Sequence, residues 1–402
     1  MRNREARFRR SPHLVCYWAE GQLVFHNFAA AKRVAASPLT AQVLDFFDRW
    51  RPVRSLFSRF PEYSRVSLRH AVASLVKHSL LERSDRPRDP RARALDPWKA
   101  WNPVAGFFHM ATKDAPFTRQ AELAQRRFIR YARAHPMPPA TKRYPRAPSV
   151  ALPAPATAGE FPRVLLGRRT WRQFAPRPLA LRDLATLLGL TWRVQRWVRA
   201  PGLRPLALKT SPSGGSLHPI EVYVLARRVL GLAHGLYHYD AAAHRLERLR
   251  RGPSATGQTA DYLPGQWWFG DAAAIFLMTA VFARSQWRYA FARTYRVILA
   301  EAGHLCQTFC LVATWLGLAP FCTMALADSK IERDLGIDGV SESVLYVAGV
   351  GARPPGVSWA PWPEKKRNRQ WAPIRTGSQK SEVRSSKRGP GPRGHRAPGG
   401  AS

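Results

Sequence analysis

The feature that most constrains the fold is the run from Ala302 to Ala327, which contains no formally charged residue. A run of this length has to lie in a protein core or in a membrane. The stretch "LGLAP" at 316–320 interrupts it with glycine and proline, which end a helix rather than continue it. We therefore predict a buried helix followed by a buried strand, and no membrane span.

The charge of the chain is the second constraint. The 402 residues carry a formal net charge of +38, much of it arginine dispersed among alanine and proline. A dispersed excess attracts polyanions without specifying one, and so indicates a generally basic surface rather than a dedicated nucleic-acid site. The basic N-terminus is not followed by an apolar core and a cleavage site, so no signal peptide is predicted. We expect a soluble, cytoplasmic protein.

The four cysteines are too few for a disulfide framework in a chain of 402 residues. Cys306 and Cys310 stand four residues apart with His304 nearby, a spacing that would suit a metal. They lie, however, in the apolar run "LCQTFCLVA", and no second ligand pair accompanies them. The sequence therefore predicts buried thiols and no metal site.

Residues 1–95 are predicted to form a small winged-helix-like module. Apolar residues recur at helical spacing in "SPLTAQVLDFFDRW", "VRSLFSRF" and "VSLRHAVASLVKHSLLER". Such modules often bind DNA through the second helix of the turn. The last helix carries few basic residues, which favours a docking or peptide-holding role over DNA binding.

Residues 96–158 are rich in proline and arginine and are predicted to connect two domains, with one helix in "RQAELAQRRFIRYARAH". The aromatic cluster in "WKAWNPVAGFFHMATKDAPF" is too apolar for a free linker, so we expect it to lie against a domain surface. Residues 363–402 form a basic tail with almost no apolar content, predicted to be disordered and to touch nucleic acid or an acidic partner only weakly.

Residues 159–362 are predicted to form the main domain. Helices are expected from Phe161 and from Leu181, with strands in "IEVYVLA", "AAAIFLMTAVFA", "APFCTMAL" and "ESVLYVAGVG". The segment "GLYHYDAAAHRLERL" alternates around a turn and indicates a hairpin. Because helices and strands do not alternate regularly, the predicted class is α+β.

Two segments of this domain carry residues suited to ligand binding. Arg168, Arg169 and Arg172 surround Thr170, and guanidinium forks suit phosphate oxygens, although the same residues would suit a basic helix end. The loop "KTSPSGGSLHP" has two glycines that permit close backbone approach. It lacks the Lys-Ser/Thr ending of a P-loop, which excludes a triphosphate cradle.

Six segments, in this order, together resemble one family: "GRRTWRQF", "TSPSGGSLHPIEVYVLA", "GLYHYD", "WRYAFARTYRVILAEAGHLCQ", "LGLAPFCTMAL" and "DLGIDGVSESVLYVAGVGARP". The chain resembles the SagB/McbC-type (thiazole/oxazole) dehydrogenase branch of the FMN-dependent nitroreductase superfamily over residues 160–355. The resemblance implies a mixed sheet flanked by helices and a homodimer with FMN at its interface. Residues 1–95 more loosely resemble the peptide-holding module of such enzymes.

The resemblance also implies the cofactor contacts. The FMN phosphate, ribityl chain and N1/O2 edge would be held by Arg168, Arg169, Thr170 and Arg172. The flavin ring, in the partner subunit's site, would be lined by Pro212, Ser213, Gly214 and Gly215, with His218 in the same motif. The N5/O4 edge would face Thr323 and Met324, and Arg353 would be a late phosphate contact. A cation near N1/O2 suits the negative charge of reduced flavin.

The catalytic pair implied by the resemblance is Arg288 and Tyr289, where family members that oxidise azoline rings have Lys-Tyr. In those enzymes one group takes a proton while hydride passes to flavin N5, and oxygen regenerates the cofactor. Arginine side chains stay protonated and cannot act as a base, so Arg288 is expected to orient a carbonyl or stabilise negative charge. Tyr289 is then the group that can move a proton.

The first functional hypothesis is therefore an FMN-dependent oxidoreductase that acts on a peptide-derived, azoline-like or other small substrate, with a biosynthetic partner protein. An alternative is an NAD(P)H-dependent nitroreductase or a quinone or flavin reductase. A third, from another class, is a flavin-binding regulatory or peptide- or DNA-binding protein without turnover.

Overall fold

The computed structural model describes residues 5–115, 120–135, 152–199, 201–202, 204–251 and 261–356. The predicted tail at 363–402 lies outside these residues. So do most of residues 136–158, the last part of the predicted connection. The described residues belong to one compact unit.

The N-terminal region contains two small antiparallel sheets and three helices. One sheet has the order β5 (Arg51–Pro52), β1 (Arg7–Arg10), β6 (Leu81–Arg83); the other has β2 (Leu14–Ala19), β3 (Gln22–Asn27), β4 (Lys32–Ala35). The helices are α1 (Pro38–Phe46), α2 (Arg54–Phe57) and α3 (Arg65–Lys77). Leu44, Phe47 and Leu56 are buried in their shared core. The three predicted helices are present, while the winged-helix-like assignment stays a prediction.

The end of α3 differs from the predicted helical pattern. The helix begins after Ser64, whose hydroxyl accepts from the Ser67 backbone N–H at 3.0 Å, as an N-cap does. It ends at Lys77, because Ser79 adopts a left-handed φ of 61° and turns the chain. Leu81 then pairs with Arg10 in β1, so the "LLER" stretch forms a strand.

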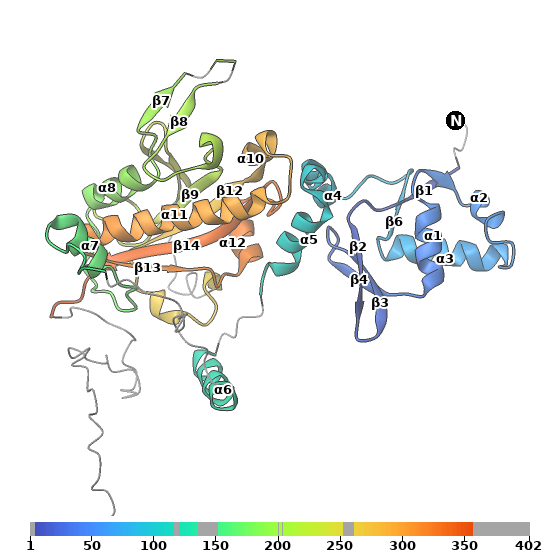
Figure 1. Ribbon diagram of the computed structural model, residues 1–402, viewed down its shortest axis with the longest axis horizontal. Helices are drawn as coiled ribbons and strands as arrows, with labels where there is room; N and C mark the ends of the chain where they lie inside the picture. The colour runs from blue at the N-terminus through green and yellow to red at the C-terminus, as the bar shows by residue number, and fades with distance from the viewer. Residues whose placement is uncertain are drawn as a thin grey trace, which may run out of the picture. The chain divides into compact units, whose positions relative to one another are not determined.

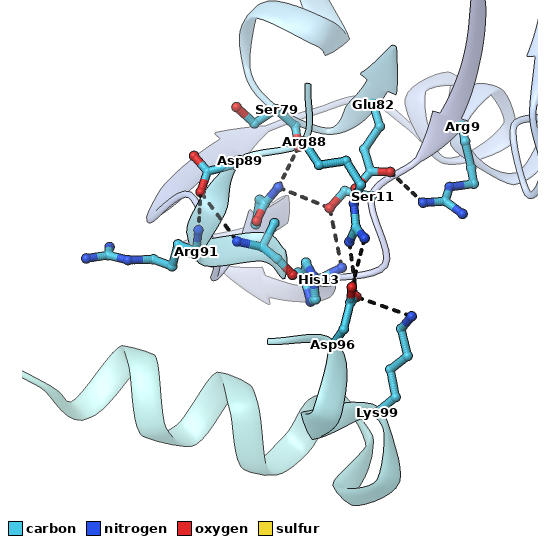
Figure 2. Close-up of polar contacts among 12 residues, drawn as sticks. Arg9, Ser11, His13, Ser79, Glu82, Arg88, Asp89, Arg91, Asp96 and Lys99 are labelled. Atoms are coloured by element: carbon cyan, nitrogen blue, oxygen red, sulfur yellow. Dashed lines mark hydrogen bonds and ion pairs between the residues drawn. The ribbon is translucent and has the colours of Figure 1, made fainter. Parts of the chain in front are cut away.

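A polar network joins the first sheet to the segment that follows it (Figure 2). Arg88 donates two hydrogen bonds to Asp96, at 2.9 and 3.1 Å, and lies 3.5 Å from Glu82. Glu82 also pairs with Arg9 at 2.5 Å. A His13 ring nitrogen lies 3.0 Å from the Ala92 carbonyl oxygen. These contacts tie β1 and β6 to α4 (Pro90–Ala94) and to the 3₁₀ helix η1 (Asp96–Trp101).

The aromatic cluster of the connection is buried, which confirms that it lies against a domain surface. Trp98 and Trp101, in η1, pack against Phe282 and Tyr295 of the main domain. His109, in α5 (Asn102–Thr112), lies 2.8 Å from the Tyr295 hydroxyl, and burial lowers the pKa of His109 to about 4. The helix predicted in the next segment is α6 (Ala121–Ala134).

The main domain is built on a six-stranded sheet (Figure 1). Its order is β11 (Arg245–Arg251), β10 (Gly235–Asp240), β9 (Ile220–Ala226), β12 (Ala274–Val281), β14 (Glu342–Ala352), β13 (Leu318–Thr323). Each of the five pairings between these strands is antiparallel, so the predicted mixed sheet is wrong for the described residues. The sequence pattern marks strands but does not encode their direction, because buried strands of either kind are apolar runs.

The helices of this domain are α7 (Glu160–Gly167), α8 (Leu181–Thr191), α10 (Phe282–Arg288), α11 (Thr294–Trp315) and α12 (Asp328–Leu335), and β7 (Arg196–Val198) pairs with β8 (Leu206–Leu208). Of the described helices, only α11 is long and apolar enough to cross a membrane. Ile298, Leu305 and Phe309 on α11 are buried in the core with residues of the sheet and of α8. The chain then turns at Gly317 into β13, which confirms the predicted buried helix followed by a strand.

Candidate functional site

The arginine segment (residues 168–172) follows α7 and runs beside the edge strand β13. The Trp171 backbone N–H donates to the Pro320 carbonyl at 2.9 Å, which fixes the segment against β13. Arg169 is exposed and donates to the carbonyls of Leu166 and Arg168, at 2.9 and 2.7 Å. The half-buried Arg168 guanidinium makes no hydrogen bond or ion pair within the described residues. Its charge is therefore left for another group.

Arg172 and Arg353 are also half-buried at this end. Burial lowers the pKa of both guanidinium groups. Arg353 donates to the carbonyls of Leu318 and Thr314, at 2.8 and 3.2 Å, and lies over the Trp171 ring. Two N–H groups of Arg353 thus already donate to main-chain carbonyls. Its contact with a phosphate stays a prediction.

Thr323 and Met324 lie at the far end of β13. The Thr323 hydroxyl donates to the side-chain oxygen of Gln266 at 2.7 Å and accepts from the Ala325 backbone N–H at 3.1 Å. These bonds fix the turn after the strand, and Met324 is 57% exposed. Sequence reasoning missed Gln266, for which the sequence offers no motif.

The glycine-rich loop leads from β8 into β9 and is anchored by its serines. The Ser211 and Thr308 hydroxyls lie 2.7 Å apart, which ties the loop to α11. The Ser213 hydroxyl accepts from the His218 backbone N–H at 2.9 Å. Gly215 has a left-handed φ of 66°, a conformation that glycine adopts without steric cost.

The structure brings this loop against the predicted catalytic pair. A Cβ atom on Gly215 would lie 2.8 Å from the Tyr289 hydroxyl oxygen and 3.1 Å from Nη1 of Arg288. The Tyr289 carbonyl accepts from Trp101 Nε1 at 2.9 Å, so the connection segment helps to hold this residue. The Arg288 guanidinium carbon lies 5.5 Å from the centre of the Tyr289 ring. Gly215 thus lies in close contact with the ends of both side chains.

Beneath the loop lies a group of buried ionisable residues, of which the sequence singled out only His218 as functional. Burial raises the pKa of Glu301 to about 7, and the Ser213 hydroxyl, the Lys209 charge and the Gly214 backbone partly oppose this shift. Burial and the Lys209 charge lower the pKa of His218 to about 4. His218 Nε2 lies 2.9 Å from the Ala207 carbonyl oxygen, so this histidine helps to fix β8.

The same group extends into the sheet. Glu221 in β9 pairs with Arg284 at 2.5 Å and lies 3.3 Å from Nε2 of His238. Hydrogen bonds to Glu221 and Glu247 raise the pKa of His238 to about 9. Acidic and basic groups beneath the loop therefore neutralise one another, in contrast to the arginine segment.

Apart from Thr323 and Met324, the predicted site residues fall into two groups at opposite ends of α11. A Cβ on Gly167, next to Arg168, would contact Thr314 near the end of the helix, whereas a Cβ on Gly214 would contact Val297 near its start. At about 1.5 Å per residue, these two positions lie about 25 Å apart along the helix axis. The two groups of one chain are therefore separated by most of the length of α11.

The donor chemistry of the arginine end fits the phosphate of FMN. Arg168 and Arg172 bring two partly buried cations to one segment, and a partly buried guanidinium binds a phosphate more strongly than an exposed one does. The buried Trp171 Nε1 has no hydrogen-bond partner within the described residues. At the other end, the close approach of backbone at Gly214 and Gly215 suits a flat ring.

Comparison with known proteins gives the following relatives. Residues 165–352 match the sequence model described as the Nitroreductase family. A protein of Methanocaldococcus jannaschii described as a nitroreductase is 30% identical over 190 residues, which cover 47% of this chain and 89% of that protein. The trifolitoxin-processing protein TfxB of Rhizobium leguminosarum bv. trifolii is 34% identical over 181 residues, 42% of this chain and 46% of TfxB. The chain thus spans under half of TfxB.

Among solved structures, the E. coli microcin synthetase McbBCD complex with truncated pro-MccB17 aligns with a TM-score of 0.47 and 20% identity. That alignment covers 67% of this chain and all of the other chain (100%). No functional conclusion rests on a likeness of this degree.

Proposed function

Because the chain belongs to the nitroreductase family, whose members are generally oxidoreductases, we propose that it is an FMN-dependent oxidoreductase of the SagB/McbC-type dehydrogenase branch. Its proposed substrate is a peptide-derived, azoline-like ring or another small molecule. The relative that carries the name trifolitoxin-processing protein supports a biosynthetic role over a general reductase role. A biosynthetic partner protein is part of the proposal.

The observation that carries this proposal is the contact of Gly215 with Arg288 and Tyr289. The loop predicted to lie against the flavin ring and the pair predicted to act on the substrate meet at one place, although more than 70 residues separate them in the chain. Packing does not require an arginine at 288 or a tyrosine at 289, because Arg288 is exposed and Tyr289 is half-buried. This exposure supports the proposal that both side chains contact a substrate.

The chemistry proposed for the chain's own residues is simple. FMN, when bound, supplies a two-electron acceptor. The Tyr289 hydroxyl accepts or donates a proton at the substrate, and the Arg288 guanidinium orients a carbonyl and stabilises negative charge that develops on it. Arg168, Arg169, Thr170 and Arg172 would hold the phosphate and ribityl groups. Pro212, Ser213, Gly214 and Gly215 would exclude water from one face of the ring.

A homodimer is part of the proposal, and the separation of the two residue groups along α11 supports it. A twofold axis would place the arginine end of one subunit beside the glycine loop of its partner, so that two copies complete two sites. Trp287, Phe291 and Val297, at or near α10 and the start of α11, are 69%, 54% and 41% exposed, and Val297 lies against Gly214 of the loop. Apolar side chains gathered at an exposed surface are typical of a surface that a partner covers.

The N-terminal module is proposed to hold the substrate peptide. A groove of about 800 Å³ is lined by residues of β2 and β3 and of α5, among them Tyr17, His26, Phe107 and Met110. Aromatic and apolar walls of this kind suit peptide side chains. The proposed location is the cytoplasm, since all four cysteines are free, as in a reducing compartment.

The test of turnover is anaerobic reduction of the FMN-loaded full-length protein, followed by absorbance near 450 nm. An azoline-containing peptide is expected to bleach the flavin, and NADPH alone is expected to leave it oxidised. Bleaching by NADPH alone would favour the reductase alternative. A protein that takes up no FMN would contradict both enzyme hypotheses.

The test of the shared site mixes two variants, Arg168→Met and Gly215→Val, each damaged at one end of α11. The FMN concentration is set so that it fills wild-type sites and leaves either variant alone largely empty. In mixed dimers one site collects both changes and the other collects neither. Random mixing is then expected to restore about a quarter of the wild-type sites. No recovery in mixed dimers shown to have formed would contradict a site shared between subunits.

A further inference from the structure

A group of sulfur atoms lies between α11 and β13, apart from the residues proposed to contact substrate. Cys306 and Cys310 are four residues apart on α11 and so share one face of the helix. Cys322 comes from β13, which packs against that face. The three Sγ atoms lie within 4.8 Å of one another. The fourth cysteine, Cys16, is exposed on β2.

A tyrosine hydroxyl joins these three sulfurs. Cys322 pairs with Ala348 of β14, and Tyr346 stands two residues from Ala348 on the same face of the strand. The Tyr346 hydroxyl oxygen lies 3.6 Å from the Cys322 Sγ atom. Three elements that are distant in sequence therefore deliver three sulfurs and one oxygen to one place.

The separations suit a tetrahedral metal ion. With a Zn–S bond of about 2.3 Å and a Zn–O bond of about 2.0 Å, tetrahedral angles place two sulfurs about 3.8 Å apart and a sulfur and an oxygen about 3.5 Å apart. The observed sulfur–oxygen distance of 3.6 Å agrees with this value, and the sulfurs lie within about 1 Å of theirs. Small rotations of the side chains would complete the geometry.

The surroundings also favour a bound cation with thiolate ligands. Cys306 and Cys310 are 2% and 3% exposed, so their thiolates would be stable only when paired with positive charge. Arg168 is the neighbouring cation that acts on Cys310 and Cys322. Three thiolates, one neutral tyrosine hydroxyl and one divalent ion carry one net negative charge.

From this convergence we propose that Cys306, Cys310, Cys322 and Tyr346 bind one Zn²⁺ ion in a closed, structural site. The ion would join α11 to β13 and β14, beneath the arginine segment. Binding releases the thiol protons and involves no electron transfer. Sequence inspection misses the site because Cys322 and Tyr346 are not at the ligand spacings of a zinc motif. The proposal does not depend on the proposed flavin chemistry.

The test measures metal content and thiol reactivity on the full-length protein. After incubation with Zn²⁺ and removal of excess metal, we expect about one zinc per chain and only one thiol, Cys16, that reacts quickly with a thiol reagent. Chelator treatment should expose three more. Substitution by Co²⁺ should produce sulfur-to-cobalt charge-transfer absorbance in the near ultraviolet and intense visible bands of a tetrahedral ion.

Matched variants locate the ion. Cys322→Ser should lower zinc affinity at least tenfold, whereas Cys16→Ser should leave metal content unchanged. Tyr346→Phe keeps the ring and removes the oxygen, so it should retain cobalt–sulfur absorbance with shifted visible bands. Protein that binds no zinc after this incubation would overturn the proposal, whether or not its buried thiols react. So would a disulfide between two of them, seen as a loss of two mass units in metal-free protein as isolated.

Discussion

The two ends of α11 differ in the kind of ligand group that each is suited to bind. At the arginine end, the half-buried Arg168 lacks an acidic partner within the described residues, and Arg172 stands beside it. At the glycine end, Glu221, Arg284 and their neighbours neutralise one another, and the surface is defined by shape. The first end attracts an anion by charge, and the second accepts a flat group by close backbone approach. Substitutions at the two ends should therefore affect flavin binding in different ways.

The largest effect is expected from Gly215→Val. The added side chain would collide with the Tyr289 hydroxyl and Arg288, and valine is strained at a φ of 66°. We expect the loss of most turnover, flavin affinity lowered at least tenfold, and stability lowered by about 1–3 kcal/mol. Flavin titration and thermal unfolding measure these. Gly303→Ala is the control, since nothing lies within 4 Å of its added Cβ.

The sequence alone suggests Gly214→Val as the informative change, with flavin occupancy expected to suffer more than folding. The structure identifies Gly215 as the more sensitive position. A Cβ on Gly214 would meet Val297 Cγ1 at 3.1 Å, a contact that a small shift relieves. Wild-type flavin affinity in both variants would show that the loop tolerates a larger side chain at either position.

Tyr289→Phe is expected to reduce turnover about 10²-fold or more while flavin affinity stays within twofold. The change removes only the hydroxyl, so the ring still packs beside Gly215 and the main-chain bond from Trp101 persists. Steady-state kinetics with the azoline peptide measure the effect. Unchanged turnover would exclude proton transfer by this residue.

Arg168→Met is expected to weaken flavin binding about tenfold to a hundredfold, because a charge-assisted hydrogen bond to phosphate contributes about 1.5–3 kcal/mol. Riboflavin, which lacks the phosphate, should bind wild type and variant equally. Arg163→Met on the exposed face of α7 is the matched control. Equal loss for FMN and riboflavin would indicate a general structural role instead.

The last expected effect is a pH dependence at the glycine end, which acts on stability and not on turnover. Because burial raises the pKa of Glu301 to about 7 in the folded protein, the folded state keeps a proton that the unfolded state loses near pH 4.5. Stability from this group is thus present below pH 4.5 and falls as pH rises to 7, by up to about 3 kcal/mol. Glu301→Gln should remove this dependence. Thermal midpoints of both proteins at pH 5 and pH 8 test it, and parallel curves would contradict it.

Sequence reasoning worked where local pattern carries the information. The buried helix after Thr294, the hairpin around 241–244 and the aromatic anchor at Trp98 and Trp101 were predictable, because apolar periodicity and turn residues act over a few neighbours. The strand directions and the end of α3 at Lys77 were not. They depend on pairing with distant strands, which overrides local preference.

The sequence by itself determined the α+β elements, the family resemblance and the residue types offered for anion and ring binding. Only the tertiary structure decided which of them meet. It placed Gly215 against Tyr289, separated that pair from Arg168 by the length of α11, and brought Cys322 and Tyr346 to Cys306 and Cys310. The physical reason is that backbone periodicity is local, whereas contacts between elements follow from the order and register of the sheet.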